Sequence, residues 1–347
     1  MITKIQMRLT RRQHLIENLH MAFGLAAGGI LTSVAGGAAA QSGEVPWPTS
    51  KPIKLLIPAQ PGGGLDLVAR TTADRLARLM SVPWVCENIG GGGGSIAATT
   101  VARAAPDGQT FMITNISTHG TNPAVRKLPY DAIKDFSHVA MVGGTPNVLL
   151  CGPTLSQVGS VEELIARIKA RDGQAAYGSA GPGTSSHLLM EQFKAATGTQ
   201  LTHVPYRGIG PAMVDLLAGR TDIAFPGLTA AASFIKSSRL KPLAVTSRTR
   251  QTMLPDVPTF AEIGMKDFSS LQWYGLSGPA RLPVSIVKLL NSQVNKVLAD
   301  PEVIAKFSGE ALSVMPMTSQ EFSAFVAEDI RKWIKLVKDQ KIEVETS

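Results

Sequence analysis

The chain has 347 residues and a formal net charge of +8, and aromatic side chains make up only 5% of it. Part of the positive charge lies in the first forty residues. The rest has neither a run of Lys and Arg nor the aromatic platforms of a nucleic-acid-binding protein, which excludes that class. A chain of this length exceeds what one hydrophobic core usually serves, so two lobes are expected. No later segment approaches about 18 uninterrupted apolar residues, so no membrane-spanning helix is predicted there.

Residues 1–40 have the pattern of a signal peptide that is removed on export. Arg8, Arg11 and Arg12 precede an apolar run at 21–34, and the alanines at 38–40 supply the small residues that a signal peptidase needs. The Arg11-Arg12 pair also fits a twin-arginine signal, which exports folded cargo, and an ordinary Sec signal is the alternative. Either route predicts an exported protein.

The next part of the chain alternates short apolar runs with amphipathic segments. Strands are predicted at 53–58, 82–87 and 110–115, and helices at 66–80 and 96–105. This βαβαβ order is typical of a doubly wound, mostly parallel sheet.

A second set of the same kind follows. Helices are predicted at 161–170 (after a Ser160 cap), 185–197 and 211–218, and strands at 175–178, 201–205, 222–225 and 240–246. The fold class is therefore α/β, with two doubly wound lobes.

The chain is expected to cross between the lobes and to return. Residues 139–153 are apolar enough to cross as strands, and 272–279 is predicted as a returning strand before long helices at 284–299 and 319–337. We therefore expect lobe 1 to comprise residues 46–144 plus 271–347, and lobe 2 residues 145–270.

Two cysteines, Cys86 and Cys151, lie in apolar strand-like runs. An exported compartment permits a disulfide, but free cysteines commonly pack as small hydrophobic side chains. Two buried thiols are the favoured interpretation. No spacing of side chains suits a metal, and neither a metal nor another cofactor is expected.

Three glycine-rich loops, at 61–66, 88–95 and 177–186, each fall where a strand meets a helix N-terminus. Glycine lets the backbone approach a ligand closely, and the N–H groups at a helix start favour an anion. Nucleotide binding is a poor alternative, because the loops contain neither G-x-x-x-x-G-K-[S/T] nor an opening G-x-G-x-x-G. Tight turns alone would explain one such loop, but three at equivalent positions indicate a ligand site.

Other candidates flank these loops. Asp66 is either the cap of its helix or a ligand contact, and capping is the commoner role. Ser117 and Thr118 offer hydroxyls to the same crevice, and His119 is either a ligand contact or a surface histidine. No G-x-S-x-G elbow surrounds the serines of loop 177–186, and no other catalytic motif is present, so an enzyme is not expected.

Taken as an ordered set, the motifs resemble those of the Bug/TctC family, the periplasmic receptors of tripartite tricarboxylate transporters. The resemblance extends over nearly all of the chain after residue 40. The matching segments are 57–66 with Ala69 and Arg70, 87–88, 105–108, 177–187, 203–208, 215–219 with Asp222, 243–247, 254–259 and 273–276.

The resemblance implies a type II periplasmic-binding-protein fold whose lobes close on a small carboxylate. One end of the ligand would be held by the first loop, at Pro61, Gly62, Gly63, Gly64 and Asp66. The other end would be held by Ser117, Thr118, His119, Ser179, Gly183, Thr184 and Ser185. Tyr206, Arg207 and Gly208 would lie near the cleft, with Arg207 either pairing with a carboxylate or solvated.

The same resemblance implies a monomeric periplasmic protein that delivers its ligand, without chemistry, to integral membrane transporter subunits in a transient complex. A ligand receptor for a sensor kinase is an alternative with the same fold. An exported serine hydrolase using a serine of loop 177–186 is an alternative of another class.

The chain departs from the family pattern at three positions. Leu65 stands where a small or hydroxylated residue is usual, Ile89 where arginine is frequent, and Pro226 where an acid is frequent. Loss of that acid disfavours an amino-acid ligand, since an ammonium group needs a negative partner. The resulting hypothesis is a mono- or dicarboxylate with an apolar body, either aliphatic or aromatic.

Overall fold

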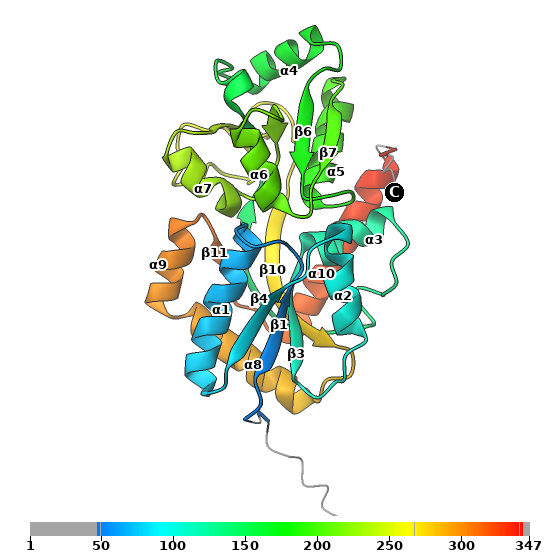
Figure 1. Cartoon of the computed structure of the whole chain (residues 1–347), viewed down its shortest axis with the longest axis vertical. Coiled ribbons are helices and arrows are strands. Elements are labelled where there is room, and N and C mark those ends of the chain that lie inside the picture. Colours follow the sequence, from blue (N-terminus) through cyan, green and yellow to red (C-terminus); the bar gives the residue numbers. More distant parts are fainter. Residues whose placement is uncertain (1–46, 49, 267, 340, 343–347) are drawn as a thin grey trace, which may run out of the picture. The chain divides into compact units, whose positions relative to one another are not determined.

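Two mixed β-sheets organise the chain, each covered by helices on both faces (Figure 1). The computed structural model describes residues 47–48, 50–266, 268–339 and 341–342, all of which belong to one compact unit. The predicted signal peptide at 1–40 lies outside the described residues.

The first sheet has the strand order β11-β4-β10-β3-β1-β2. Its strands are β1 (Ile53–Ile57), β2 (Trp84–Asn88), β3 (Thr110–Asn115), β4 (Phe136–Pro146), β10 (Leu271–Pro279) and β11 (Ser313–Val314). The helices associated with it are α1 (Gly64–Met80), α2 (Ser95–Ala102), α3 (Asn122–Val125), α8 (Val284–Leu298), α9 (Pro301–Gly309) and α10 (Ser319–Asp339). A short 3-10 turn, η1 (Gly92–Gly94), precedes α2, and a π-helix, η2 (Ser117–Thr121), follows β3.

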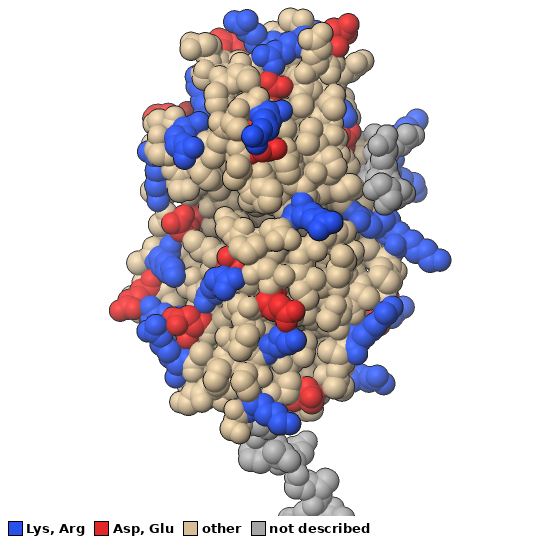
Figure 2. All heavy atoms as spheres, in the orientation of Figure 1, with Lys and Arg blue, Asp and Glu red and all other residues tan. Residues whose placement is uncertain are grey.

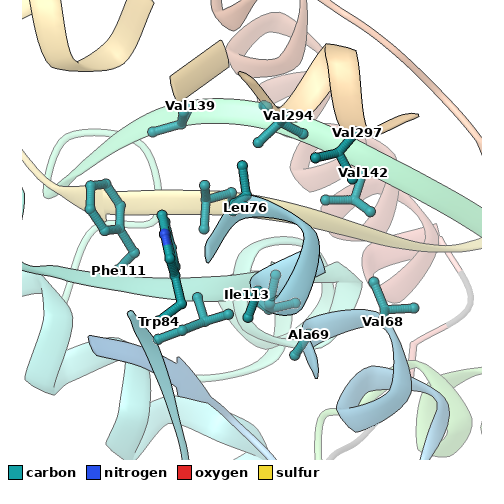
Figure 3. Packing of buried hydrophobic residues seen from close by; sticks show 14 of the residues in the cluster. Val68, Ala69, Leu76, Trp84, Phe111, Ile113, Val139, Val142, Val294 and Val297 are labelled. Carbon is teal, nitrogen blue, oxygen red and sulfur yellow. The ribbon is translucent and has the colours of Figure 1, made fainter. Parts of the chain in front are cut away.

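The core of this sheet follows the two-residue period of its strands. In β1, Ile53, Leu55 and Ile57 pack with α1 and α8 on one face, whereas Leu56 packs with α2 on the other. Figure 3 shows the first of these clusters, where side chains from α1 and α8 meet side chains of β3 and β4. All four named β1 side chains are almost completely buried, so this strand anchors the loop that follows it.

The second sheet has the order β7-β6-β8-β5-β9. Its strands are β5 (Val148–Cys151), β6 (Ala176–Ser179), β7 (Thr202–Pro205), β8 (Ile223–Ala224) and β9 (Lys241–Val245). The helices are α4 (Val161–Ala170), α5 (Ser185–Thr197), α6 (Ile209–Leu217) and α7 (Leu228–Lys236), with a 3-10 turn η3 (Pro153–Leu155) after β5. Helices α4 and α5 share one apolar cluster with the sheet, and α6 and α7 share the cluster on the opposite face.

We call each sheet with its helices a lobe, and both lobes are α/β as expected. The residue boundaries given above for the two lobes stay a prediction. The sheets are mixed, however, and the expectation of mostly parallel sheets is wrong. Among the named strands of the described chain, β1 pairs parallel with β2 and β3, and β6 pairs parallel with β7 and β8. The strands on either side of the crossings, β4, β5 and β10, pair antiparallel because the chain runs out of one lobe and back into it.

The lobes are joined where β4 continues into β5 and where the chain returns into β10. Asn147 lies between β4 and β5, and its backbone N–H donates to Thr246 Oγ1 at 2.8 Å. Thr246 Oγ1 in turn donates to the Ser270 carbonyl at 2.8 Å, and Ser270 Oγ donates to Asn147 Oδ1 at 3.3 Å. All three residues are buried, so hydrogen bonds hold the two crossing segments together.

Both cysteines are free thiols. Cys151 is buried on β5, as expected, but Cys86 is only half-buried because β2 is the edge strand of its sheet. In the described part of the chain, no helix combines the length and the apolar character that a membrane crossing needs.

Candidate ligand-binding site

A cavity of about 60 Å³ lies between the two lobes. This volume is several times the roughly 10–15 Å³ that one water molecule requires. Both lobes and the returning strand β10 line it. The lining residues are Pro58, Ala59, Gly64, Leu65, Gly91, Gly93, Gly94, Asn115, Ser117, Ala180, Thr184, Ser185, Ser186, Arg207, Gly208, Ile209, Pro226, Gly227, Ala230, Gln272 and Tyr274.

Five helix N-termini contribute to this lining. They belong to α1, α2, α5, α6 and α7, whose first residues or N-cap residues face the cavity. None of the five N-caps makes a side-chain hydrogen bond to its helix. By contrast, Ser160 and Asp300 cap α4 and α9, whose N-termini do not line the cavity. Helix α8 also lacks a side-chain cap, with Pro283 at that position. Uncapped N–H groups and the helix dipoles together favour an anion in the cavity.

The charges around the cavity have one sign. Arg207 is its only charged lining residue in the described part of the chain, and neither a carboxylate nor an imidazole lines it. Elsewhere, the face shown in Figure 2 intersperses Lys and Arg with Asp and Glu and carries no broad field of one sign. The charge that lines the cavity is therefore positive and comes from Arg207.

Hydrogen bonds across the lobes close the cavity. Ser185 Oγ, at the start of α5, donates to Gln272 Oε1 on β10 at 2.7 Å. The Ser185 backbone N–H points to Ser117 Oγ of η2 at 3.4 Å. The first turn of α5 is thus bonded both to the π-helix of the first lobe and to the returning strand.

Asp66 shapes the first glycine-rich loop. Its carboxylate accepts from the Gly62 backbone N–H at 3.3 Å, from Arg70 Nε at 3.0 Å and from Asn88 Nδ2 at 2.9 Å. Burial acts to raise the pKa of Asp66, but these hydrogen bonds and the Arg70 charge outweigh it, so the pKa is lowered. Helix α1 begins at Gly64 with Gly63 as its N-cap, so the expected N-cap role of Asp66 is wrong. It lies in the first turn and fastens the loop.

A stack of rings supports the loop that precedes α5. His187 Nδ1 accepts from the Gly183 backbone N–H at 3.1 Å, and its ring stacks on His203 with centroids 4.2 Å apart. His203 Nε2 and Ser179 Oγ are hydrogen-bonded at 2.6 Å, and Ser179 Oγ accepts from the Gly181 backbone N–H at 3.0 Å. The two imidazole rings therefore hold in place the loop that contains the cavity residues Ala180 and Thr184.

The fifteen residues expected at the site fall into three groups. Six line the cavity: Gly64, Ser117, Thr184, Ser185, Arg207 and Gly208. Four line a separate groove of about 480 Å³ beside α6 and α7: Pro61, Gly62, Gly63 and Tyr206. Five line neither the cavity nor this groove: Asp66, Thr118, His119, Ser179 and Gly183.

His119 illustrates the third group. It is fully buried, so the surface alternative is wrong. Its Nδ1 lies 2.9 Å from Thr118 Oγ1, and its ring packs edge-on against Phe136 at 4.4 Å. Burial, and secondarily the neighbouring His138, lower its pKa well below the usual value. His119 belongs to η2, and its side chain packs in the core.

Several lining residues were not expected from the sequence. Asn115 ends β3, and Gln272 and Tyr274 lie in β10, where Tyr274 pairs with Asn115 across the sheet. Gly227 and Ala230 belong to the N-terminus of α7, a helix missing from the predicted elements. An apolar run ending in a polar residue was the only sequence signal for Asn115.

The Ser179–His203 pair bears on the hydrolase alternative. A hydroxyl bonded to an imidazole is the first requirement of a serine nucleophile. Ser179 is, however, fully buried, and it does not line the cavity. Among the described residues, no group of His, Cys, Asp and Glu side chains could hold a metal ion.

A small cavity closed between two α/β lobes and lined by helix N-termini defines a solute-binding protein. Residues 68–342 match the family described as "Tripartite tricarboxylate transporter family receptor". The chain is 34% identical to protein BugT of Bordetella pertussis over 318 residues. This alignment covers 91% of this chain and 96% of BugT.

Two solved structures with named ligands are also similar. Rpa4515 of R. palustris with adipate is 33% identical, with a TM-score of 0.82 over 86% of this chain and 99% of that one. MatC of Rhodopseudomonas palustris with bound malate is 29% identical, with a TM-score of 0.80 over 83% and 99%. This chain therefore belongs to the Bug/TctC family of periplasmic solute-binding receptors. The resemblance seen in the motifs and the periplasmic-binding-protein fold that it implied are both confirmed.

Proposed function

We propose that this protein captures a small carboxylate between its two lobes and delivers it, chemically unchanged, to the membrane subunits of a tripartite tricarboxylate-type transporter. The observation that carries the proposal is the convergence of five uncapped helix N-termini on a cavity whose only charged lining residue, in the described part of the chain, is Arg207. Each helix terminus favours an anion by about 0.3–1 kcal/mol at a surface, and by more where water is excluded.

Six of the fifteen expected residues are proposed as direct ligand contacts, because they line the cavity: Gly64, Ser117, Thr184, Ser185, Arg207 and Gly208. Asp66, Ser179 and Gly183 are proposed to act indirectly, since their hydrogen bonds hold the loops that reach the cavity. The other six are proposed to shape these loops through packing and through hydrogen bonds of their own: Pro61, Gly62, Gly63, Thr118, His119 and Tyr206.

The relatives support a carboxylate ligand. One similar structure is described with adipate and another with bound malate, and both compounds are dicarboxylates. The proposal for this chain is a monomer in the periplasm that meets its membrane partners transiently. Export by the twin-arginine route stays part of the proposal, on the strength of Arg11 and Arg12.

Ligand binding can be tested with the mature protein, residues 41–347, unfolded and refolded to strip bound ligand. Thermal unfolding is followed with aliphatic dicarboxylates, tricarboxylates, amino acids and aromatic acids. An acid at 100 times its dissociation constant adds about 2.7 kcal/mol of stability, a shift of several degrees. Arg207→Gln should weaken carboxylate binding, whereas Arg167→Gln, at an exposed position on α4, should not. A panel in which no carboxylate shifts the midpoint contradicts the proposal.

Delivery needs its own assay. Uptake of the identified acid into cells that carry the transporter subunits should require this protein, and Arg207→Gln should reduce that uptake in step with its loss of affinity. If uptake is unchanged when the gene for this protein is deleted, the proposed delivery to the transporter is wrong. The proposed binding of the ligand is not affected by that result.

The hydrolase alternative is favoured by one observation, the 2.6 Å contact between Ser179 Oγ and His203 Nε2. Burial of Ser179 weighs against it. Turnover of small esters by the mature protein, abolished by Ser179→Ala, would support this alternative. Without such turnover the pair is better explained as a support of the loop before α5.

A further inference from the structure

One tyrosine hydroxyl is left without a partner in the protein, and it lies at the cavity. The chain has four tyrosines, and three of them donate hydrogen bonds within the protein. These bonds run from Tyr130 to the Thr118 carbonyl at 2.7 Å, from Tyr177 to Glu191 Oε1 at 2.5 Å, and from Tyr206 to Asp215 Oδ2 at 2.7 Å.

The fourth, Tyr274, lines the cavity and is only 2% exposed. Within the described residues its hydroxyl has no hydrogen-bond partner, and the oxygen is not sealed from solvent. Burial raises the pKa of Tyr274, so the hydroxyl is protonated at neutral pH and can donate a hydrogen bond to a ligand.

The Asn115 amide offers a second donor at the same place. Its Oδ1 accepts from the Thr118 backbone N–H at 3.0 Å and from Thr118 Oγ1 at 3.1 Å. A backbone N–H can only donate, so this contact fixes which end of the amide is the oxygen. Asn115 Nδ2 has no hydrogen-bond partner among the described residues, and Asn115 lines the cavity.

The register of the first sheet brings these two donors together. Tyr274 on β10 pairs directly with Asn115 on β3 in the antiparallel ladder. Directly paired residues share a face of the sheet, with Cβ atoms about 4.5–5.5 Å apart. Two neutral donors side by side suit the oxygens of a carboxylate, which can accept several hydrogen bonds.

We propose that Tyr274 and Asn115 are ligand-binding residues: the Tyr274 hydroxyl and the Asn115 amide donate hydrogen bonds to carboxylate oxygen of the ligand, in addition to the helix N-termini and Arg207. Thr118 is the positioning residue, because its hydrogen bonds turn the Asn115 amide nitrogen toward the cavity. This inference rests on the proposed function, since it concerns the same cavity.

Tyr274→Phe removes the hydroxyl and keeps the ring. The melting temperature of the ligand-free mature protein should not change, because the hydroxyl has no partner in the protein. Affinity for adipate and malate, the acids named in the similar structures, should fall roughly ten- to 100-fold in calorimetric titration. If neither acid binds, the acid with the largest effect in the thermal panel replaces them.

Tyr177→Phe is the matched control. It makes the same chemical change at a tyrosine that does not line the cavity and whose hydroxyl donates to Glu191. This variant should melt at a lower temperature and bind the same acid as tightly as wild type. A merely structural role of the Tyr274 hydroxyl predicts that Tyr274→Phe also lowers the melting temperature.

A Tyr274→Phe variant that binds as tightly as wild type overturns the inference, since the hydroxyl would then meet only water. That result leaves the proposed function standing. Failure of every carboxylate to bind the wild-type protein overturns the proposed function and this inference with it.

Asn115→Asp tests the amide. The new side chain keeps an acceptor for the Thr118 N–H but replaces the N–H donors with a negative charge, so affinity at pH 7 should fall at least about tenfold. Gln320→Glu adds the same charge at an exposed position on α10 and should leave affinity unchanged. Equal affinity in wild type and in an Asn115→Asp variant that unfolds cooperatively overturns the role of the amide.

Discussion

Ser185 Oγ donates a hydrogen bond of 2.7 Å to Gln272 Oε1, and both residues are buried. Ser185 opens α5 in the second lobe, whereas Gln272 lies on β10, which belongs to the sheet of the first. The bond therefore joins the two lobes inside the cavity. This hydrogen bond can form only when the lobes are closed, and a ligand in the cavity lies next to it.

Ser185→Ala should consequently weaken ligand binding more than it weakens the fold. The substitution leaves Gln272 Oε1 without its donor in a buried place, which costs about 1–3 kcal/mol in the closed form. The dissociation constant for the best carboxylate should rise roughly five- to 150-fold. Titration calorimetry checks this, and Ser233→Ala, at an exposed serine of α7, is the matched control. Equal affinity in wild type and Ser185→Ala would contradict a role for the bond in closure.

Gly90→Ala should hinder closure without straining the backbone. Gly90 is not in the left-handed region, but a Cβ there would lie 3.2 Å from the Arg207 carbonyl oxygen and 3.0 Å from Gln60 Nε2. The Arg207 backbone belongs to the opposite lobe, so the lobes must move apart by a few tenths of an ångström. Ligand affinity should fall at least about tenfold, which calorimetric titration of wild type and variant measures.

Gly309→Ala provides the control for this substitution. A Cβ at Gly309 meets no atom within 4 Å, and the residue ends α9 without a left-handed φ. Alanine there should stabilise the protein slightly, by about 0.4–1 kcal/mol, and leave affinity alone. If Gly309→Ala and Gly90→Ala lower affinity equally, close contact at the interface is not the cause.

Local sequence signals predicted some elements to the residue. Helix α4 runs from Val161 to Ala170 as expected, because Ser160 Oγ caps it by accepting from the Glu163 backbone N–H. Helix α5 also has its expected bounds, and it ends at Gly198 in the left-handed conformation. These ends depend on side chains close in the sequence, which is why the pattern of residues was sufficient.

Other elements left weaker signals. Helix α7 starts after Gly227 without a polar cap, so nothing in the sequence marked its beginning. Helix α9 was also missed, although Asp300 and Pro301 are a recognisable N-cap and first position. Strand β11 consists of two residues and exists only through its pairing with β4. Such pairing cannot be read from a local pattern.

The same distinction applies to the cavity. Loop residues such as Gly64 and Ser185 were predictable because each glycine-rich or serine-rich loop opens a helix. Gln272 and Asn115 were not, since they meet only through the antiparallel register that places Tyr274 opposite Asn115. Contacts set by strand register between distant segments are the part of the site that one sequence does not specify.

His187→Asn should make the protein less sensitive to acid. Burial, followed by the nearby charges of His203, Lys194 and Arg126, lowers the pKa of His187 to about 3. The unfolded state then binds one proton more than the folded state between pH 6.5 and about 3. Stability contributed by the neutral ring is present above pH 6.5 and is lost as the pH falls through this window, by up to about 1.4 kcal/mol per pH unit.

Denaturant unfolding at pH 7, 6, 5 and 4 measures this effect. Asparagine retains an acceptor for the Gly183 N–H, which His187 Nδ1 holds at 3.1 Å, but it does not titrate. The variant should lose stability less steeply with acid than wild type, whereas His187→Leu should also be less stable at pH 7. Parallel pH profiles for wild type and His187→Asn would show that another group, such as the buried His138, dominates the acid response.

Asp329→Asn should stabilise the protein at alkaline pH. Asp329 on α10 accepts from Trp273 Nε1 at 2.8 Å, next to the cavity residues Gln272 and Tyr274. Burial raises its pKa to about 6, although the Trp273 hydrogen bond and Lys332 oppose the rise. The folded state therefore binds more protons than the unfolded state between pH 3.8 and about 6. The stability that the protonated carboxyl contributes is full below pH 3.8 and is lost as the pH rises through 6.

Above that range the native protein carries a buried carboxylate, whose charge costs about 1–3 kcal/mol relative to a neutral group. Asparagine removes the charge and can still accept from Trp273 Nε1. Its advantage in the free energy of unfolding should thus be largest at pH 8 and vanish near pH 4. Asp256→Asn, at an exposed position, should show no such dependence. Equal stabilisation by Asp329→Asn at pH 4 and pH 8 would mean that packing, rather than the charge on Asp329, causes it.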